Sequence, residues 1–140
     1  MKNKIFIAVG IILICIISFI FIHKNKKDNY LTAADYVFEM IDDGTISVFD
    51  FYDEDSLTDI SSNSKLNDII KNDINFYSLK VGSKDVIFFA TGGHLKNAEG
   101  YVIVRNGAKP AEKYPEIGYG DRIHYEKIAD RMYSFDAVLP

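Results

Sequence analysis

The feature that most constrains this chain is an uncharged, mostly apolar run of 18 residues close to its start, Ile5 to Ile22. A helix rises about 1.5 Å per residue, so this run makes a helix about 27 Å long, close to the roughly 30 Å hydrocarbon core of a bilayer. A continuous helix satisfies every backbone amide within itself, as the interior of a bilayer requires. We therefore expect residues 5–22 to cross the lipid bilayer as a single transmembrane helix.

A cleaved signal peptide is the main alternative for this run. Its apolar core would be about 7–15 residues long and would end at a small-x-small cleavage site. The run here is longer and continues into His23-Lys24-Asn25-Lys26-Lys27, which offers no such site. Cys15 lies within the run and follows Ile14, so a lipoprotein cleavage site is also excluded. We expect an uncleaved signal anchor, preceded by a short tail at residues 1–4.

The orientation of this anchor is weakly encoded. Lysines flank it on both sides, at residues 2 and 4 and again at 24, 26 and 27, so the positive-inside rule gives nearly a tie. A very short tail before a single anchor commonly stays in the cytoplasm while the following domain is exported. A body without cysteine fits an oxidising exterior. We expect a single-pass protein of the cell membrane with an extracytoplasmic domain; a cytoplasmic subunit of a membrane complex is the alternative.

Charge divides the chain into two parts. Residues 1–27 hold five lysines and no acid, whereas residues 28–140 hold all 20 acidic residues and 11 Lys and Arg, a net charge of −9. Such a body repels phosphate backbones, which argues against nucleic acid as a partner. The single cysteine lies in the apolar run, which excludes an internal disulfide and a cysteine-based metal cluster. We expect a polar tether at residues 23–29 and an acidic globular domain at residues 30–140.

The first part of this domain has the pattern of a helix followed by a strand. Thr32 and Asp35 have the spacing of a capping box, and apolar residues then recur at helical spacing up to Asp42. Gly44 suits the left-handed position after the last turn. From Thr45 to Phe51 the pattern alternates, which predicts a strand.

The remainder predicts one more helix and a series of hairpins. Residues 53–63 are polar and indicate a loop, and residues 64–73 have the spacing of a short helix. The predicted strands span 74–81, 86–91, 100–105, 122–128 and 132–137, with turns at 82–85 and 129–131. A helix over 126–132 is the alternative to the last hairpin. We therefore expect an α+β domain, in which one amphipathic helix packs on a mostly antiparallel sheet of five or six strands.

Few residues point to catalysis. His94 follows two glycines that allow a sharp turn, and it could act as a base with Asp121 or His124. This combination would suit a small membrane-bound hydrolase. However, the chain has no Gly-x-Ser-x-Gly motif, and its only cysteine lies in the apolar run, so the usual nucleophile signatures are missing. A solvated loop histidine explains the same pattern.

The densest acidic patch comprises Asp53, Glu54, Asp55 and Asp59. Calcium loops need several such oxygens together with a glycine at the sixth position, which is missing here. Zinc is disfavoured because the two histidines of the body, His94 and His124, are thirty residues apart without a supporting cysteine. We therefore expect neither metal nor cofactor. The patch would instead present an electrostatic surface to a basic protein partner.

Together these observations favour a small, non-catalytic, membrane-anchored domain of a bacterial-type cell that acts by protein–protein contact. Immunity to a secreted toxin and an accessory role in a membrane complex are two forms of this hypothesis. The membrane-bound hydrolase is the rival hypothesis. The identity of the partner and the oligomeric state are not encoded in any motif that we recognise.

Overall fold

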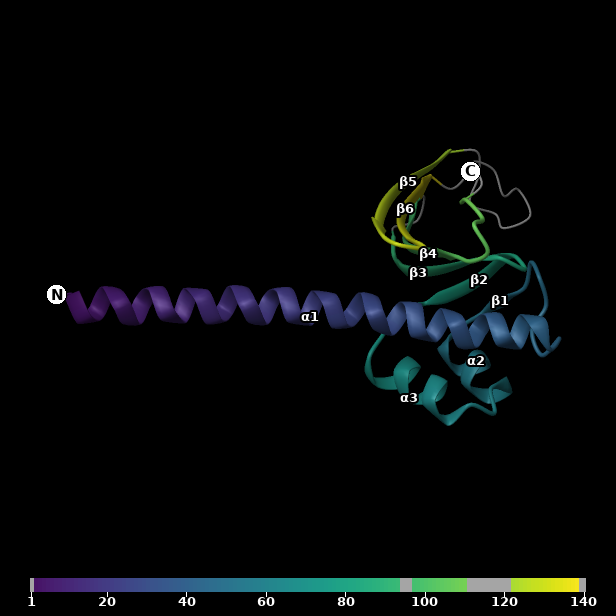
Figure 1. The fold of residues 1–140 in the computed structure, drawn as a ribbon. Helices are drawn as coiled ribbons and strands as arrows, with labels where there is room; N and C mark the ends of the chain where they lie inside the picture. The colour runs from purple at the N-terminus through teal and green to yellow at the C-terminus, as the bar shows by residue number, and fades with distance from the viewer. Residues whose placement is uncertain (1, 94–96, 111–121, 139–140) are drawn as a thin grey trace.

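A single long helix joins the start of the chain to the centre of the domain (Figure 1). The structure is a computed structural model that describes residues 2–93, 97–110 and 122–138. The second half of helix α1 (Lys2–Asp42) and two short helices, α2 (Glu54–Ile60) and α3 (Ser64–Asn72), pack side by side on one face of a six-stranded sheet. Every strand pairing is antiparallel, so the α+β class is confirmed.

The sheet has the strand order β1-β2-β3-β4-β6-β5. Its strands are β1 (Phe51–Tyr52), β2 (Ser78–Ser83), β3 (Val86–Gly92), β4 (Asn97–Val104), β5 (Arg122–Ala129) and β6 (Met132–Val138). The last hairpin folds back so that β6, and not β5, pairs with β4. Strand β5 therefore lies at one edge of the sheet and the two-residue strand β1 at the other.

The predicted break between the apolar run and the next helix is wrong. Residues 23–29 are helical, and α1 continues through them without interruption. The Thr32 hydroxyl does not cap a helix start; it donates to the carbonyl oxygen of Asp28, 2.8 Å away and one turn earlier, as in a helix interior. Lysine is a good helix former, so a polar composition alone does not end a helix. The predicted end is confirmed: α1 stops at Asp42, and Gly44 has a φ of 79°.

The first half of α1 is apolar and exposed. Its large apolar side chains from Ile7 to Ile22 are between 51% and 65% exposed. Within the described residues, α1 is the one helix that is long and apolar enough to cross a membrane, judged by length and composition. An exposed apolar surface of this size in water would be costly.

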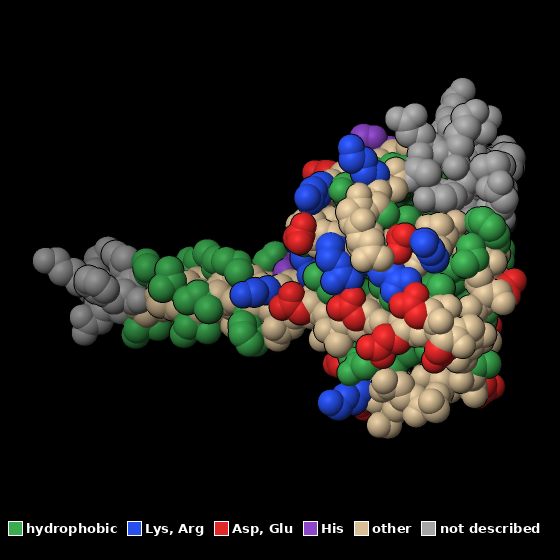
Figure 2. All heavy atoms as spheres, turned by 45° about the vertical axis from the view of Figure 1, so that its right-hand side comes forward, with side chains coloured by type: hydrophobic (Ala, Val, Ile, Leu, Met, Phe, Trp, Pro, Cys, Tyr) green, Lys and Arg blue, Asp and Glu red, His purple; other side chains and the backbone are tan. Residues whose placement is uncertain are grey.

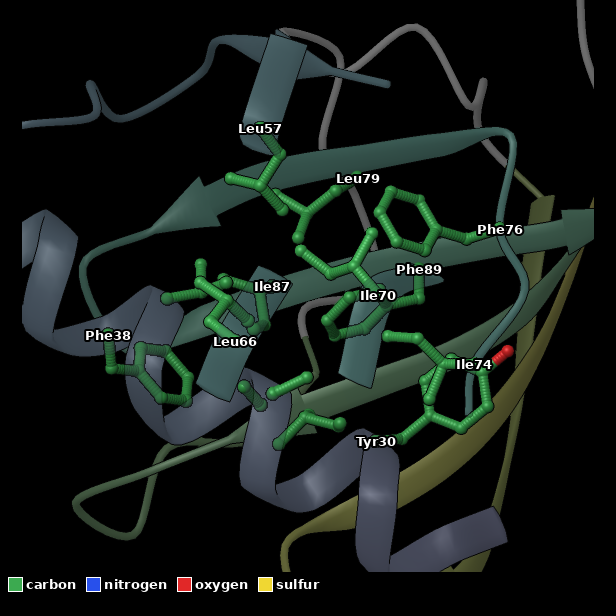
Figure 3. Close-up of a cluster of buried hydrophobic side chains, with 14 of the residues drawn as sticks. Tyr30, Phe38, Leu57, Leu66, Ile70, Ile74, Phe76, Leu79, Ile87 and Phe89 are labelled. Atoms are coloured by element: carbon green, nitrogen blue, oxygen red, sulfur yellow. The ribbon is translucent and has the colours of Figure 1, made fainter. Parts of the chain in front are cut away.

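The second half of α1 forms the centre of the main core. Ala33, Ala34 and Val37 are fully buried, and Tyr30 and Phe38 are 1% and 2% exposed. Figure 3 shows these two aromatic rings among side chains from the sheet and from α2 and α3. The small alanines let the helix backbone approach the sheet closely. The second half of α1 is therefore an integral part of the main core.

The sheet is apolar on its other face as well. Phe88 and Phe135 meet edge to face there, with ring centroids 5.4 Å apart. Val102 and Ala137 are fully buried in the same cluster. Because successive residues of a strand face opposite sides, β3 and β4 alternate between this cluster and the main core.

Two predictions for residues 45–63 are wrong. The chain after α1 does not form a strand over 45–51, because Ile46 donates its N–H to Met40 and Phe49 takes a φ of 73°. Only Phe51 and Tyr52 pair with β2. The predicted loop contains α2, which Asp53 caps by accepting a hydrogen bond from the N–H of Ser56 at 2.8 Å.

The later elements agree more closely with the sequence pattern. Helix α3 occupies the predicted helix, and the hairpins β2–β3 and β5–β6 form at the predicted turns. The alternative helix over 126–132 is not formed. Strand β4 begins at Asn97, three residues earlier than predicted, which adds Glu99 to the sheet.

Two arginines fasten the second half of α1 to the sheet. Arg105, just after β4, donates to both carboxylate oxygens of Asp42 at 2.6 and 2.7 Å and to Asp85 at 3.1 Å. Arg131, in the β5–β6 turn, pairs with Asp35. Hydrogen bonds from Arg105 hold the pKa of the Asp42 carboxyl below its usual value. These pairs lie towards the end of α1 that is remote from the apolar run.

We expect Ile103→Ala to lower the free energy of unfolding by about 2–5 kcal/mol, because it leaves a cavity in the main core. Ile103 is fully buried on β4. Urea denaturation of the full chain in detergent micelles measures the change. Val138→Ala is the control, since Val138 is 47% exposed and its truncation should change stability by less than about 0.5 kcal/mol. Equal effects of the two substitutions would contradict the assigned core.

We also expect the link between the two halves of α1 to be stiff. Spin labels on the native Cys15 and on a cysteine at Lys65 should give a narrow distance distribution by pulsed electron paramagnetic resonance. Asn25→Pro removes a helix hydrogen bond and kinks the helix, which should broaden the distribution. Asn25→Ala keeps the helix and should preserve it. A broad distribution in the unsubstituted helix would contradict a continuous α1 in solution.

Candidate functional site

A hollow of about 390 Å³ lies over strands β4, β6 and β5. It is on the face of the sheet that packs against α1, because Tyr101 of β4 both lines it and contacts Tyr30 of α1. Its polar and aromatic lining includes Glu99, Tyr101, His124, Glu126, Ser134 and Asp136. We call this site the β4–β6–β5 hollow.

Strand register brings these side chains together in two rows. Glu99, Asp136 and His124 are direct partners across the three strands and form one row. The second row lies two residues along each strand and consists of Tyr101, Ser134 and Glu126. Because side chains two residues apart share a face, both rows point into the hollow.

Aromatic packing fixes the side of the hollow nearest α1. The rings of Tyr101 and Tyr30 have centroids 4.8 Å apart, and Tyr30 meets Phe89 edge to face at 5.4 Å. The Tyr30 hydroxyl donates to the carbonyl oxygen of Asn75. Burial raises the pKa of Tyr30 to about 12, so its phenol remains protonated under ordinary conditions. The hollow thus has one fixed aromatic wall.

The glycines before His94 shape the rim of the hollow. Thr91 lines it, and Gly92 leaves room for the side chain of Glu99, which a β-carbon at this position would meet. Gly93 has a φ of 141°, a conformation that favours glycine. In the described part of this segment, the glycines therefore serve strand geometry.

The hollow has the chemistry of a binding site for a cation. The carboxylates of Glu99, Glu126 and Asp136 are exposed, and beside them lie the imidazole of His124 and the phenol of Tyr101. Carboxylates accept hydrogen bonds from ammonium and guanidinium groups, and an aromatic face adds a cation–π contact. Within the described residues, no three acidic, histidine or cysteine side chains are placed to hold a metal ion.

The predicted catalytic group can be located only in part. His124 lies on β5 and lines the hollow, opposite Asp136 of β6. His94 and Asp121 lie outside the described residues. The combination of His124 with either of them therefore stays a prediction.

The predicted acidic patch lies elsewhere, on and before α2. Asp53 caps this helix, and hydrogen bonds from Ser56 lower the pKa of the Asp53 carboxyl. Glu54 and Asp55 occupy the first turn, where the helix dipole favours negative charge. Asp55 and Asp59 are exposed and one turn apart, so they share one side of α2. Helix α2 follows β1 at the edge of the sheet opposite β5, so the acidic patch is far from the hollow (Figure 1).

Lys80 is a buried titratable residue that the sequence pattern assigned only to a strand. It is 1% exposed on β2, and its ammonium lies over the ring of Phe51, 3.1 Å from the centroid. Burial lowers its pKa to about 8. Its strand partner Phe88 belongs to the cluster on the far face of the sheet, so Lys80 is remote from the hollow.

Most residues of the hollow were missed by sequence analysis. The alternating pattern of 122–128 correctly places His124 and Glu126 on one face. Glu99 lay in a predicted loop, and nothing in the pattern revealed that β6 inserts between β4 and β5. The signal for Asp136 and Ser134 was their two-residue spacing opposite an equally polar pair on β5.

We expect a difference in pH dependence between the wild-type chain and Lys80→Met. The pKa of Lys80 is about 8 in the folded chain and 10.5 as its ordinary value, so between these values the unfolded chain binds more protons. The wild-type stability should therefore rise with pH across this interval, by roughly 1–3 kcal/mol relative to Lys80→Met. Urea titrations of both chains between pH 7 and 10 measure this difference. Parallel curves would contradict the lowered pKa.

Comparison of the chain with protein-family models, with curated proteins and with solved structures gave no match. The function is therefore inferred from the fold and from its surfaces.

Proposed function

We propose that this protein is a single-pass membrane protein whose small, non-catalytic domain is held on the outer side of the membrane and acts by binding a protein partner. The observation that carries the proposal is the dual role of α1. Its first half is apolar and exposed, and its second half is part of the main core. In this proposal the first half is an uncleaved signal anchor in the bilayer.

A continuous helix gives such an anchor a specific advantage. The domain is held at one height and in one orientation, because no flexible segment separates it from the apolar half of α1. Confinement to a surface raises the effective concentration of the domain for partners in the same membrane. A fixed orientation raises the effective concentration further, because the binding surface always faces the same direction relative to the membrane.

The proposed contact surface for the partner is the exposed side of α2. Asp55 and Asp59 point outward there, and within the described residues neither forms an ion pair. Because Asp53 is occupied in capping, its role is local. Complementary charge would steer a basic partner to this side of the domain.

The test begins with the position of the domain. Carboxyl-terminal fusions to alkaline phosphatase and to a fluorescent protein should give phosphatase activity and little fluorescence. A photo-crosslinking amino acid at Asp59 of the full chain in native membranes should then give one discrete protein adduct. The same amino acid at Asp130, an exposed residue of the β5–β6 turn, is the matched control and should give none.

Each result bears on a separate part of the proposal. Cytoplasmic fluorescence without phosphatase activity would overturn the outer location. Failure of the protein to remain in membranes after alkaline carbonate extraction would overturn the anchor. Absence of an adduct at Asp59, in a chain shown to be folded, would overturn the contact surface on α2.

A further inference from the structure

The domain lies very close to the end of the apolar run. Tyr30, the first fully buried residue of the core, follows Ile22 by eight residues, or about 12 Å of helix. The headgroup layer of one leaflet is roughly 5–7 Å thick, from the difference between the full bilayer and its hydrocarbon core. If the run ends at the hydrocarbon boundary, the nearest side of the domain is within reach of the headgroups.

The connectivity identifies which parts of the sheet face the apolar run. The opposite end of α1, at Asp42, is bound to Arg105 after β4 and through it to the β2–β3 turn. The other ends of these antiparallel strands therefore point towards the apolar run. They are the end of β3 and the start of β4. Figure 1 shows the bend of β5 on the side of the domain from which the exposed part of α1 emerges, whereas the end of β6 lies near C at the top. The β4–β6–β5 hollow belongs to this side.

Basic side chains lie on α1 at the same level. Lys26 and Lys27 precede Tyr30 by four and three residues, so they project from the side of α1 that faces the sheet. Lys26 is exposed and Lys27 half-buried. Side chains of a helix lean towards its N-terminus, so these ammonium groups lean towards the apolar run. Figure 2 shows basic and acidic side chains close together where the exposed helix meets the domain.

This side of the domain therefore carries both charges, in separate places. The lysines are on α1, and the carboxylates of Glu99, Glu126 and Asp136 are in the hollow. Within the described residues, no ion pair joins the two groups. A uniformly anionic surface would attract the lysines and repel the carboxylates. A ligand with a phosphate and an ammonium a few bonds apart would satisfy both.

We propose that the side of the domain nearest the apolar run binds the headgroup of a zwitterionic phospholipid with a primary ammonium, a phosphoethanolamine. Lys26 and Lys27 hold its phosphate, and its ammonium enters the β4–β6–β5 hollow, where Glu126 and Asp136 accept hydrogen bonds and Tyr101 provides an aromatic face. This inference rests on the proposed membrane anchor and assigns a lipid ligand to the hollow.

The hollow discriminates between headgroups by hydrogen bonding and charge. Phosphocholine carries the same charges, but its methylated nitrogen has no N–H to donate to the carboxylates. Phosphoglycerol has no cation, and its lone negative charge would meet the carboxylates unfavourably. Among these three headgroups, phosphoethanolamine alone combines the phosphate with a hydrogen-bonding cation.

A single tryptophan can report on this contact. The chain has no tryptophan, and Tyr77 is 54% exposed and donates its N–H to Ala90, the residue before Thr91 at the rim of the hollow. The full chain with Tyr77→Trp is reconstituted in vesicles of phosphatidylcholine alone, or of equal parts phosphatidylcholine and either phosphatidylethanolamine or phosphatidylglycerol. Acrylamide quenching of the tryptophan should be roughly twofold weaker or less in the phosphatidylethanolamine vesicles than in the other two.

Substitutions separate the contact from general effects of lipid composition. Glu126→Gln with Asp136→Asn should abolish the phosphatidylethanolamine effect, and so should Lys26→Gln with Lys27→Gln. The matched control, Glu39→Gln with Asp130→Asn, removes two exposed acids elsewhere and should preserve it. The residues altered in the hollow variant and in the control variant are all exposed, so both variants should fold.

The outcomes distinguish this inference from the proposed function. Equal quenching in all three lipids would overturn headgroup binding, and protection strongest with phosphatidylglycerol would replace it by simple attraction of the lysines to anionic lipid. An effect that survives substitution of the hollow would overturn the assigned site. In each of these cases, resistance of the chain to carbonate extraction from the vesicles leaves the anchor standing. Loss of the chain from the vesicles would overturn the anchor itself, and this inference with it.

Discussion

The packing of the second half of α1 against the sheet is the contact on which the rest of the structure depends. Ala33 and Ala34 bring the helix backbone close to the strands, and Tyr30 and Val37 fill the space on either side of them. Beside it on the same face of the sheet lie α2 and α3, which have only seven and nine residues. Helices this short are marginal in isolation and need such a surface to fold on. Without α1, the sheet and the two helices would each expose the apolar side that the core now covers.

The charged side chains at the two ends of the packed part of α1 differ in whether they form ion pairs. At the remote end, Arg105 and Arg131 are both ion-paired to carboxylates of α1, which fastens the helix to the strand ends. At the end near the apolar run, no ion pair within the described residues involves Lys26, Lys27 or the carboxylates of the hollow, so these groups can contact solvent or a ligand. Polar groups that a protein does not use internally are the ones available for binding. The fold thus keeps the ion pairs of Arg105 and Arg131 and the carboxylates of the hollow at opposite ends of the packed part of α1.

The sequence predicted the elements with strong local patterns and failed where distant contacts decide. The hairpin β2–β3 and helix α3 follow from periodicity, because their own residues determine both the turn and the buried side. The predicted break in the helix before Thr32 was wrong. The polar composition of residues 23–29 does not show whether the helix continues, because the packing of the following turns against the sheet decides this. The hollow could not be predicted, because it exists only once β6 lies between β4 and β5. Its acidic side chains come from three strands with no common motif.

The continuity of α1 also couples chain length to direction. Each residue of a helix adds about 1.5 Å and about 100° of rotation. One residue gained or lost between Ile22 and Tyr30 would therefore barely change the height of the domain but would turn its faces by more than a quarter of a circle about the helix axis. A change of seven residues corresponds to about two helical turns. It would nearly restore the orientation of the domain about the helix axis and change only its height. The length of this short helical segment thus determines which face of the domain points in a given direction around the helix axis.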